Sequence, residues 1–154
     1  MSFDIQHFSS ELYSFFMIVK FETQMFDLTG EDLTHHNSLF GKSVANFLKW
    51  KLIEKGYKPY IVPTSEGWQV KIEKDPILLS IKISAQWRDI EKIGESMLIW
   101  IVSTEAKVKK RFLSFFKKVD PDLYLTFLDK DLKDILFSEK KIKVLSISED
   151  RSII

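Results

Sequence analysis

Few side chains in this sequence have the types and the spacing that metal binding or catalysis requires. The nearest approach to a metal site is the pair His35-His36, which follows Asp27, Glu31 and Asp32 along a polar stretch. Neighbouring histidines rarely point at one ion, and zinc usually takes three or four well-spaced ligands. We therefore expect this stretch to be a solvated loop without a bound metal.

Nucleophile and cofactor motifs are also missing from the sequence. There is no cysteine, so thiolate nucleophiles, thiolate metal sites and disulfides are excluded. No Gly-x-Ser-x-Gly turn occurs, and the 5 glycines form no loop that could hold a phosphate. Glu22 and Glu73 could meet across strands, but any acidic pair on a solvated sheet face has the same pattern as a catalytic dyad. The sequence predicts no catalytic residue and no cofactor.

The composition is typical of one folded domain. The chain has 154 residues, of which 45% are hydrophobic, and its 13 Phe, 4 Trp and 4 Tyr argue against disorder. Its 23 basic and 22 acidic residues give a net charge of +1. No apolar run approaches the roughly 20 residues of a membrane-spanning helix, and the acidic start, Met1-Ser2-Phe3-Asp4, does not resemble a secretory signal. We expect a single domain over residues 1–154, located in the cytoplasm and not in a membrane.

Helical periodicity marks two segments in the first third of the chain. Over residues 5–16 the apolar side chains recur at the spacing of one helix face. Residues 40–52 carry a second such stripe. Asn37 or Ser38 could cap the start of that second helix, and Gly56 could end it in a left-handed conformation.

The last third of the chain also has helical spacing. Apolar residues at helical intervals predict a helix over residues 105–118, with Thr104 as its cap. Asp120-Pro121-Asp122 predicts the start of another helix, because proline fits the first turn and carboxylates favour the positive end of the helix dipole. The apolar stripe of this helix covers residues 125–136, and residues 141–148 are predicted to form a final short strand.

Alternation of apolar and polar side chains predicts strands between these helices. The predicted strands are residues 17–26, 57–62, 68–73, 77–84 and 97–102. Most of their connections are short, which favours antiparallel neighbours, since parallel pairs need long crossovers. The last of these strands is apolar at every position, which indicates a central strand. The prediction is an α+β fold: a mainly antiparallel sheet of about four to six strands with helices packed on it.

This central strand raises a question about the second face of the sheet. If Met97, Ile99 and Ile101 face the helices, large apolar side chains face the other way. Either the N-terminal helix covers them, or a partner protein, a second copy of the chain or a ligand does. Trp and Arg are enriched at interface hot spots, so the Trp-Arg pair just past a strand end suits the rim of a binding surface. The predicted partner-binding residues are Leu78, Trp87, Arg88, Leu98, Trp100 and Val102.

The charges are unevenly distributed along the chain. The net charge is −5 over residues 1–40, +8 over residues 41–118 and −2 over residues 119–154. Much of the positive charge falls on the predicted helix over residues 105–118, where it could contact the phosphates of a nucleic acid. A solvated helix face explains the same run, and the acidic first segment could steer a basic partner. The basic patch consists of Lys107, Lys110, Arg111, Lys117 and Lys118.

One stretch of the sequence resembles a known kind of protein. It contains Leu39-Phe40-Gly41, then Ala45-Asn46-Phe47-Leu48, then Leu52-Ile53-Glu54-Lys55-Gly56-Tyr57, and finally Glu66-Gly67-Trp68-Gln69-Val70. This pattern of a helix ending in Gly-Tyr, a short strand and Gly-Trp-x-Val opening a hairpin resembles small bacterial α+β proteins of the immunity-protein type. Such proteins neutralise a toxin by binding it, so the resemblance implies a protein partner and carries over no catalytic residue.

Our leading hypothesis is a small cytoplasmic protein that binds another protein, namely an immunity protein that occludes its cognate toxin. The first alternative is a nucleic-acid-binding protein that uses the predicted helix over residues 105–118. The second alternative is a small-ligand-binding protein, or an enzyme of unknown reaction, with a site in the sheet groove near Trp100.

Overall fold

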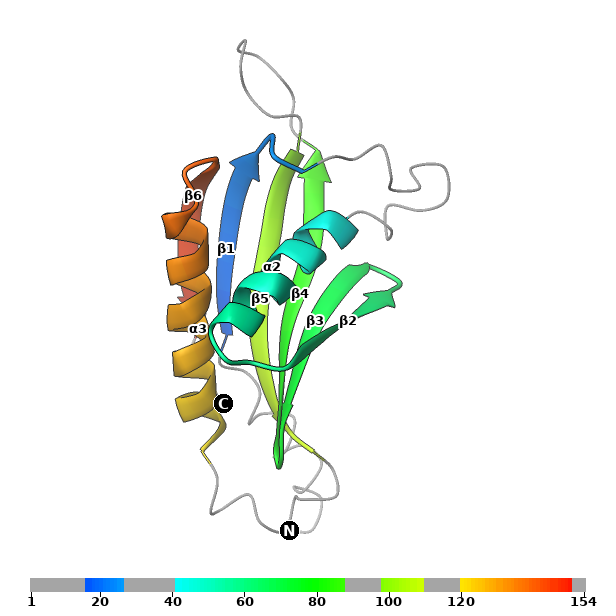
Figure 1. The fold of residues 1–154 in the computed structure, drawn as a ribbon, viewed down its shortest axis with the longest axis vertical. Helices are drawn as coiled ribbons and strands as arrows, with labels where there is room; N and C mark the ends of the chain where they lie inside the picture. Colours follow the sequence, from blue (N-terminus) through cyan, green and yellow to red (C-terminus); the bar gives the residue numbers. More distant parts are fainter. Residues whose placement is uncertain (1–15, 27–40, 88–97, 110–119, 151–154) are drawn as a thin grey trace.

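The structure of the chain, a computed structural model, describes residues 16–26, 41–87, 98–109 and 120–150 (Figure 1). Its elements follow in the order β1 (Phe16–Thr23), α2 (Lys42–Glu54), β2 (Pro59–Thr64), β3 (Gly67–Lys74), β4 (Ile77–Trp87), β5 (Leu98–Val108), α3 (Pro121–Ser138) and β6 (Ile142–Asp150). Residues 1–15, which hold nearly all of the predicted N-terminal helix, lie outside the described residues. Neither of the two described helices combines the length and the hydropathy that crossing a membrane requires.

The six described strands form one sheet in the order β2-β3-β4-β5-β1-β6, and each neighbouring pair is antiparallel. Strands β2 to β5 pair in sequence order, as the short connections predicted. β1 lies between β5 and β6, so the first and last described strands are neighbours. The predicted α+β fold with a mainly antiparallel sheet is confirmed.

α3 begins where the sequence predicts. Asp120 is the N-cap, and its Oδ1 accepts a hydrogen bond of 3.0 Å from the backbone N–H of Asp122. Pro121 occupies the first turn, where the N–H that proline lacks has no helical acceptor in any case. The predicted stripe over residues 125–136 is buried, so this side of the helix packs against the sheet.

α2 begins at a different cap from the one predicted. Gly41 precedes the helix with a φ of +110°, and no side chain of the described residues caps the first turn. Asn37 and Ser38, the predicted caps, lie outside the described residues. A Cβ at position 41 would lie 3.0 Å from Cγ2 of Ile83, so both the backbone conformation and the close packing favour glycine.

The end of α2 agrees with the prediction. Gly56 has a φ of +96°, the left-handed conformation that glycine adopts most readily. Its N–H donates to the carbonyl of Ile53, and the N–H of Tyr57 donates to the carbonyl of Leu52, both at 3.0 Å. These two bonds form a Schellman motif, which fixes the position of Tyr57 directly after the helix.

β5 extends further than the sequence predicts. The helix predicted over residues 105–118 is wrong at its start, because the strand continues to Val108. β4 is 11 residues long and pairs with β5 along its whole length, so that Ile77 at its start lies opposite Val108. The alternation that marks a strand is weak in the sequence because Thr104 and Ala106, which point toward the helices, are small. The part of that predicted helix from residue 110 onward lies outside the described residues.

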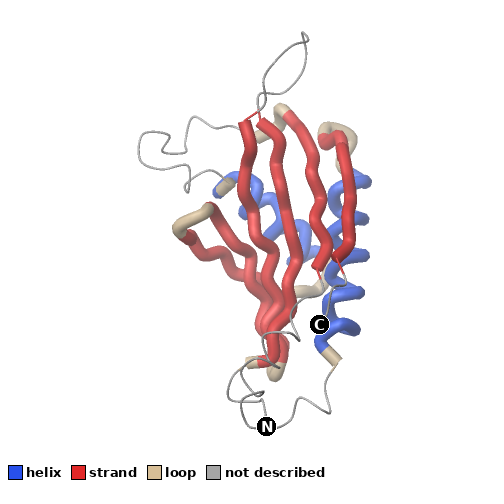
Figure 2. The backbone as a smooth tube through the Cα atoms, turned by 180° about the vertical axis from the view of Figure 1, so that it is seen from behind, coloured by secondary structure: helices blue, strands red, loops and turns tan. Residues whose placement is uncertain are grey.

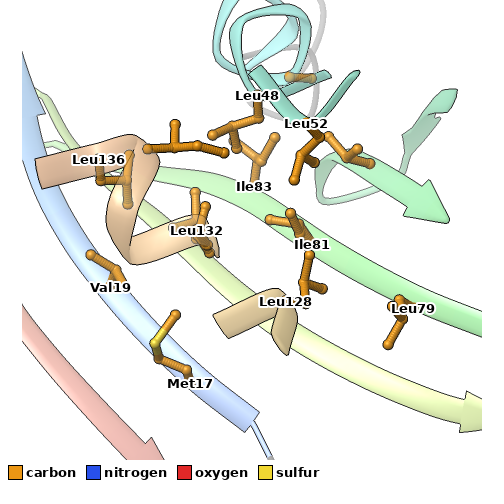
Figure 3. Packing of buried hydrophobic residues seen from close by; sticks show 14 of the residues in the cluster. Met17, Val19, Leu48, Leu52, Leu79, Ile81, Ile83, Leu128, Leu132 and Leu136 are labelled. Atoms are coloured by element: carbon orange, nitrogen blue, oxygen red, sulfur yellow. The ribbon is translucent and has the colours of Figure 1, made fainter. Parts of the chain in front are cut away.

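Both helices pack on the same face of the sheet and bury its apolar side chains (Figures 1 and 3). α2 contacts β2 and β3, and α3 contacts β5 and β6. The side chains that meet between the two layers include Met17, Val19, Leu48, Leu52, Leu79, Ile81, Ile83, Leu128, Leu132 and Leu136. Burying a side chain of this size contributes about 1.5–3 kcal/mol, so this layer holds the main core.

Neither helix covers the opposite face of the sheet, which lies in front in Figure 2. We call it the outer sheet face. Ion pairs cross it: Nζ of Lys82 on β4 lies 3.3 Å from Oε1 of Glu105 on β5, and Nζ of Lys109 bonds both Glu73 and Asp75. Half-buried apolar side chains, among them Leu78, Ile99 and Ile101, lie on this face as well, so the outer sheet face is only partly polar.

Candidate functional site

The residues predicted to bind a partner do not form one surface. Leu98, Trp100 and Val102 are 5%, 2% and 0% exposed and belong to the core under the helices. The prediction that they face away from the helices was wrong. Residues 97–102 are all apolar, so the sequence does not show which of their side chains face the helices. The pairing with β4 decides this, because Val102 lies opposite Ile83 on the face that the helices cover.

The other predicted partner-binding residues are placed only in part. Leu78 lies on the outer sheet face, half-buried and opposite Lys107. Trp87 is the last residue of β4, and its side chain lies outside the described part of the structure, as does Arg88. A binding rim at Trp87 and Arg88 therefore stays a prediction.

Of the predicted basic patch, one residue, Lys107, lies within the described part of the structure. Lys107 lies on β5 and not on a helix, and its Nζ is 3.7 Å from Oε2 of Glu105. The patch residues outside the described ranges are Lys110, Arg111, Lys117 and Lys118. The alternative of nucleic-acid binding through a basic helix is therefore not supported at Lys107, which lies on a strand.

The acidic and histidine candidates do not meet. Glu22 lies on β1 and Glu73 on β3, and two strands separate them, so the pair cannot act as a dyad. Oε1 of Glu22 is instead 3.7 Å from Nζ of Lys143. No group of three or more histidine and acidic side chains that could hold a metal occurs within the described ranges, and His35-His36 lies outside them.

A different surface carries large exposed apolar side chains. On α2, Trp50 is 62% and Ile53 is 40% exposed; on α3, Leu123, Phe127 and Phe137 are 53%, 57% and 61% exposed. We call these five residues the outer helical face. The two helices lie in one layer in front of the sheet, so their solvent sides point in a common direction (Figure 1). Single exposed apolar residues are ordinary, but five large ones on one layer are typical of a binding surface.

Sequence reasoning missed this surface because it followed only the buried stripes. Leu48 and Leu52 define the stripe of α2, and Trp50 lies about half a turn from both, on the opposite side of the helix. A tryptophan opposite a complete apolar stripe is the signal that could have found it.

The two helices carry opposite net charge. Residues 41–58, which hold α2 and the turn after it, contain five lysines and one glutamate, whereas α3 contains four aspartates and two lysines. Nζ of Lys49 lies 5.3 Å from the ring centre of Trp50, within the range of a cation–π contact. A partner that meets both helices would match them with negative charge over α2 and positive charge over α3.

A cavity of about 410 Å³ lies between the C-terminal end of α2 and the first half of α3. Leu79 of β4 and Leu123, Tyr124 and Phe127 of α3 provide its apolar lining. Because Leu123 and Phe127 also belong to the outer helical face, the cavity borders that surface.

Polar groups gather around Tyr57 at one side of this cavity. The phenol O–H of Tyr57 donates a hydrogen bond of 2.5 Å to Oδ2 of Asp131, whose Oδ1 lies 3.9 Å from Nζ of Lys55. Nζ of Lys74 lies 5.4 Å from the centre of the Tyr57 ring. Burial, and then the hydrogen bond and charge of Asp131, raise the pKa of Tyr57, so the phenol keeps its proton and remains the donor.

Ammonium groups, a carboxylate and aromatic walls are groups that recognise a ligand or partner by contact and by charge.

Comparison with protein-family models, with curated proteins and with solved structures found no match to this chain.

Proposed function

We propose that this chain acts by binding another protein in the cytoplasm, and that the outer helical face is the surface it uses. The observation that carries the proposal is the exposure of five large apolar side chains, between 40% and 62%, on two neighbouring helices. Removing apolar area from water contributes about 25 cal/mol per Å², and aromatic side chains are the usual anchors of such interfaces.

The charges of the helices would act before contact is made. The lysines around α2 attract an acidic surface, and the aspartates of α3 attract a basic one. Complementary charges of this kind speed the encounter and select one orientation, whereas the buried aromatic anchors slow dissociation.

The partner that we propose is a bacterial toxin, which this chain neutralises as an immunity protein. The support is the sequence resemblance over Leu39–Val70, a stretch that includes α2 and therefore Trp50 and Ile53. Occlusion needs a surface that covers the working site of the toxin and no chemistry from this chain.

Co-expression with the product of each reading frame beside its own gene tests the proposal. We expect one product to stop growth when expressed alone, to be tolerated together with this chain, and to co-purify with it. Substituting Trp50→Ser and Phe127→Ser together should weaken the complex by roughly a thousandfold, since interface anchors are worth about 2 kcal/mol or more each.

The matched control is Tyr60→Ser. Tyr60 is an aromatic residue that is 41% exposed, but it lies on β2 opposite Lys71, on the outer sheet face. This variant should protect growth like the unaltered chain. The proposal is wrong if no neighbouring product binds, or if the folded double variant binds as well as the Tyr60→Ser control.

A further inference from the structure

We propose that the cavity between α2 and α3 binds a small organic acid, a carboxylate joined to an aromatic or branched apolar body. The apolar body would lie against Leu79, Tyr124 and Phe127, and the carboxylate would meet the ammonium group of Lys74. This goes beyond the proposed protein partner and does not depend on it.

The size and the lining of the cavity suit such a ligand. Its volume of about 410 Å³ falls within the range of about 300–1,000 Å³ that is typical of small-molecule sites. Leu79 is itself buried, whereas more than half of the Phe127 side chain is exposed. A bound apolar body would therefore cover aromatic surface that otherwise faces water.

The charges around the cavity favour an anion. Two lysines, Lys55 and Lys74, line it together with one aspartate, Asp131. The carboxylate of Asp131 is already engaged by the O–H of Tyr57 and lies near Lys55. Lys74 makes no ion pair within the part of the chain that the structure describes, and its ammonium group stands over the ring of Tyr57. Lys74 is thus the cation available to a ligand carboxylate.

The wall between the two lysines is held in place before any ligand arrives. The backbone N–H of Tyr57 donates to the carbonyl of Leu52 at 3.0 Å, and its phenol is tied to Asp131 at 2.5 Å. Rigid walls reduce the entropy lost on binding. The negative charge of Asp131 also repels a second carboxylate, which directs the ligand carboxylate toward Lys74 and orients the apolar body toward α3.

Titration of the full chain with 3-phenylpropionate, followed by ¹H–¹⁵N NMR at neutral pH, tests the inference. We expect saturable shifts of backbone amides at residues 55–57, at Lys74 and over residues 123–131. The neutral analogue 3-phenylpropanamide keeps the ring and should bind about tenfold more weakly, because it lacks the charged contact. Acetate keeps the charge without the apolar body and should give no saturable shift at the same concentrations.

Substitutions test separately the contact with the ligand carboxylate and the contact with its apolar body. Lys74→Met should reduce the affinity for 3-phenylpropionate to that for the amide, whereas Phe127→Ser should reduce the affinity for both compounds. Lys71→Met is the matched control, because Lys71 lies on the same strand but on the outer sheet face. The spectrum of each variant also reports whether it is folded.

Equal affinity for the acid and the amide would overturn the inference, and so would shifts centred elsewhere or no saturable shift with any compound. An equal effect of Lys71→Met and Lys74→Met would overturn it as well. None of these outcomes bears on the co-expression experiment, which uses neither the acid nor the Lys74→Met variant.

Discussion

The two faces of the sheet are built from the same strands but are stabilised in different ways. Along β5, the side chains at even positions from Leu98 to Val108 point toward the helices and are at most 5% exposed. The side chains between them, from Ile99 to Lys107, are half-buried or exposed. Large apolar groups pack on the covered face, whereas ion pairs cross the outer sheet face. Because an exposed ion pair contributes at most about 1 kcal/mol, the stability of the fold resides mainly on the covered face.

Trp100→Ala should have the largest effect on stability, and Ile99→Ala is its neighbour on the other face. Trp100 is buried in the core, and its ring meets that of Phe26 edge-on, with 6.3 Å between the ring centres. Its removal leaves a cavity and should lower the free energy of unfolding by about 3–5 kcal/mol. Ile99→Ala should lower it by about 1 kcal/mol. Urea unfolding followed by circular dichroism measures both, and equal losses would contradict the difference between the faces.

One buried polar side chain departs from the rule that the covered face is apolar. Oγ1 of Thr104 accepts a hydrogen bond of 3.1 Å from the N–H of Met17, and its O–H donates one of 2.6 Å to Oδ1 of Asp129. Thr104 thus joins β5 to β1 and to α3. Buried polar groups are tolerated where they are hydrogen-bonded in this way.

Thr104→Val should therefore destabilise the protein although valine has nearly the same shape. The substitution leaves the N–H of Met17 without its acceptor and the carboxylate of Asp129 without the Thr104 donor. This should lower the free energy of unfolding by about 1–3 kcal/mol. Ser103→Val, on the outer sheet face, should change it by less than about 0.5 kcal/mol. The same urea experiment compares them. A neutral Thr104→Val would show that packing alone joins the three elements.

The sequence predicted an element well where one local pattern was enough to define it. Asp120 and Pro121 mark the start of α3 because a cap and a first-turn proline need no tertiary information. The phase of β5 could not be predicted in this way, since every residue from Leu98 to Val102 is apolar and only the pairing with β4 decides which side is covered.

The candidate surfaces were harder to predict than the elements. The cavity joins Tyr57 after α2, Lys74 at the end of β3 and Asp131 in α3, which are brought together only by packing. The outer helical face, in contrast, leaves a trace in the sequence. Trp50 and Phe127 each lie away from the buried stripe of their helix, and a helical projection finds them.

Tyrosines on the two sides of the sheet give a finer comparison. Tyr57→Phe removes the half-buried hydrogen bond to Asp131 and should lower the free energy of unfolding by about 1 kcal/mol. Tyr60→Phe removes a hydrogen bond to Glu73 that is exposed to water on the outer sheet face, and should change it by less than about 0.5 kcal/mol. The raised pKa of Tyr57 means that the folded state holds this proton more tightly than the unfolded state. Its contribution is complete below pH 10.0, the ordinary pKa, and is lost as the pH rises above it. Thermal unfolding between neutral and alkaline pH should show a smaller alkaline loss for Tyr57→Phe than for the unaltered chain; equal losses would contradict this assignment.

The smallest effect should come from the ion pairs of the outer sheet face. Nζ of Lys109 lies 2.5 Å from Oε1 of Glu73, and the hydrogen bond and charge of Lys109 lower the pKa of Glu73 below its ordinary value of 4.5. A carboxyl group with a lowered pKa stabilises the fold above that ordinary value, and its contribution is lost as the pH falls through the folded-state pKa.

Lys109→Met should therefore raise the pKa of Glu73 toward 4.5 and leave stability at neutral pH almost unchanged. Carboxyl ¹³C NMR titration measures this pKa, and Lys82→Met, which breaks the separate pair with Glu105, should not move it. If Lys109→Met also leaves the pKa of Glu73 where it was, water screens this pair completely, and the outer sheet face depends on its ion pairs even less than the comparison of the two faces implies.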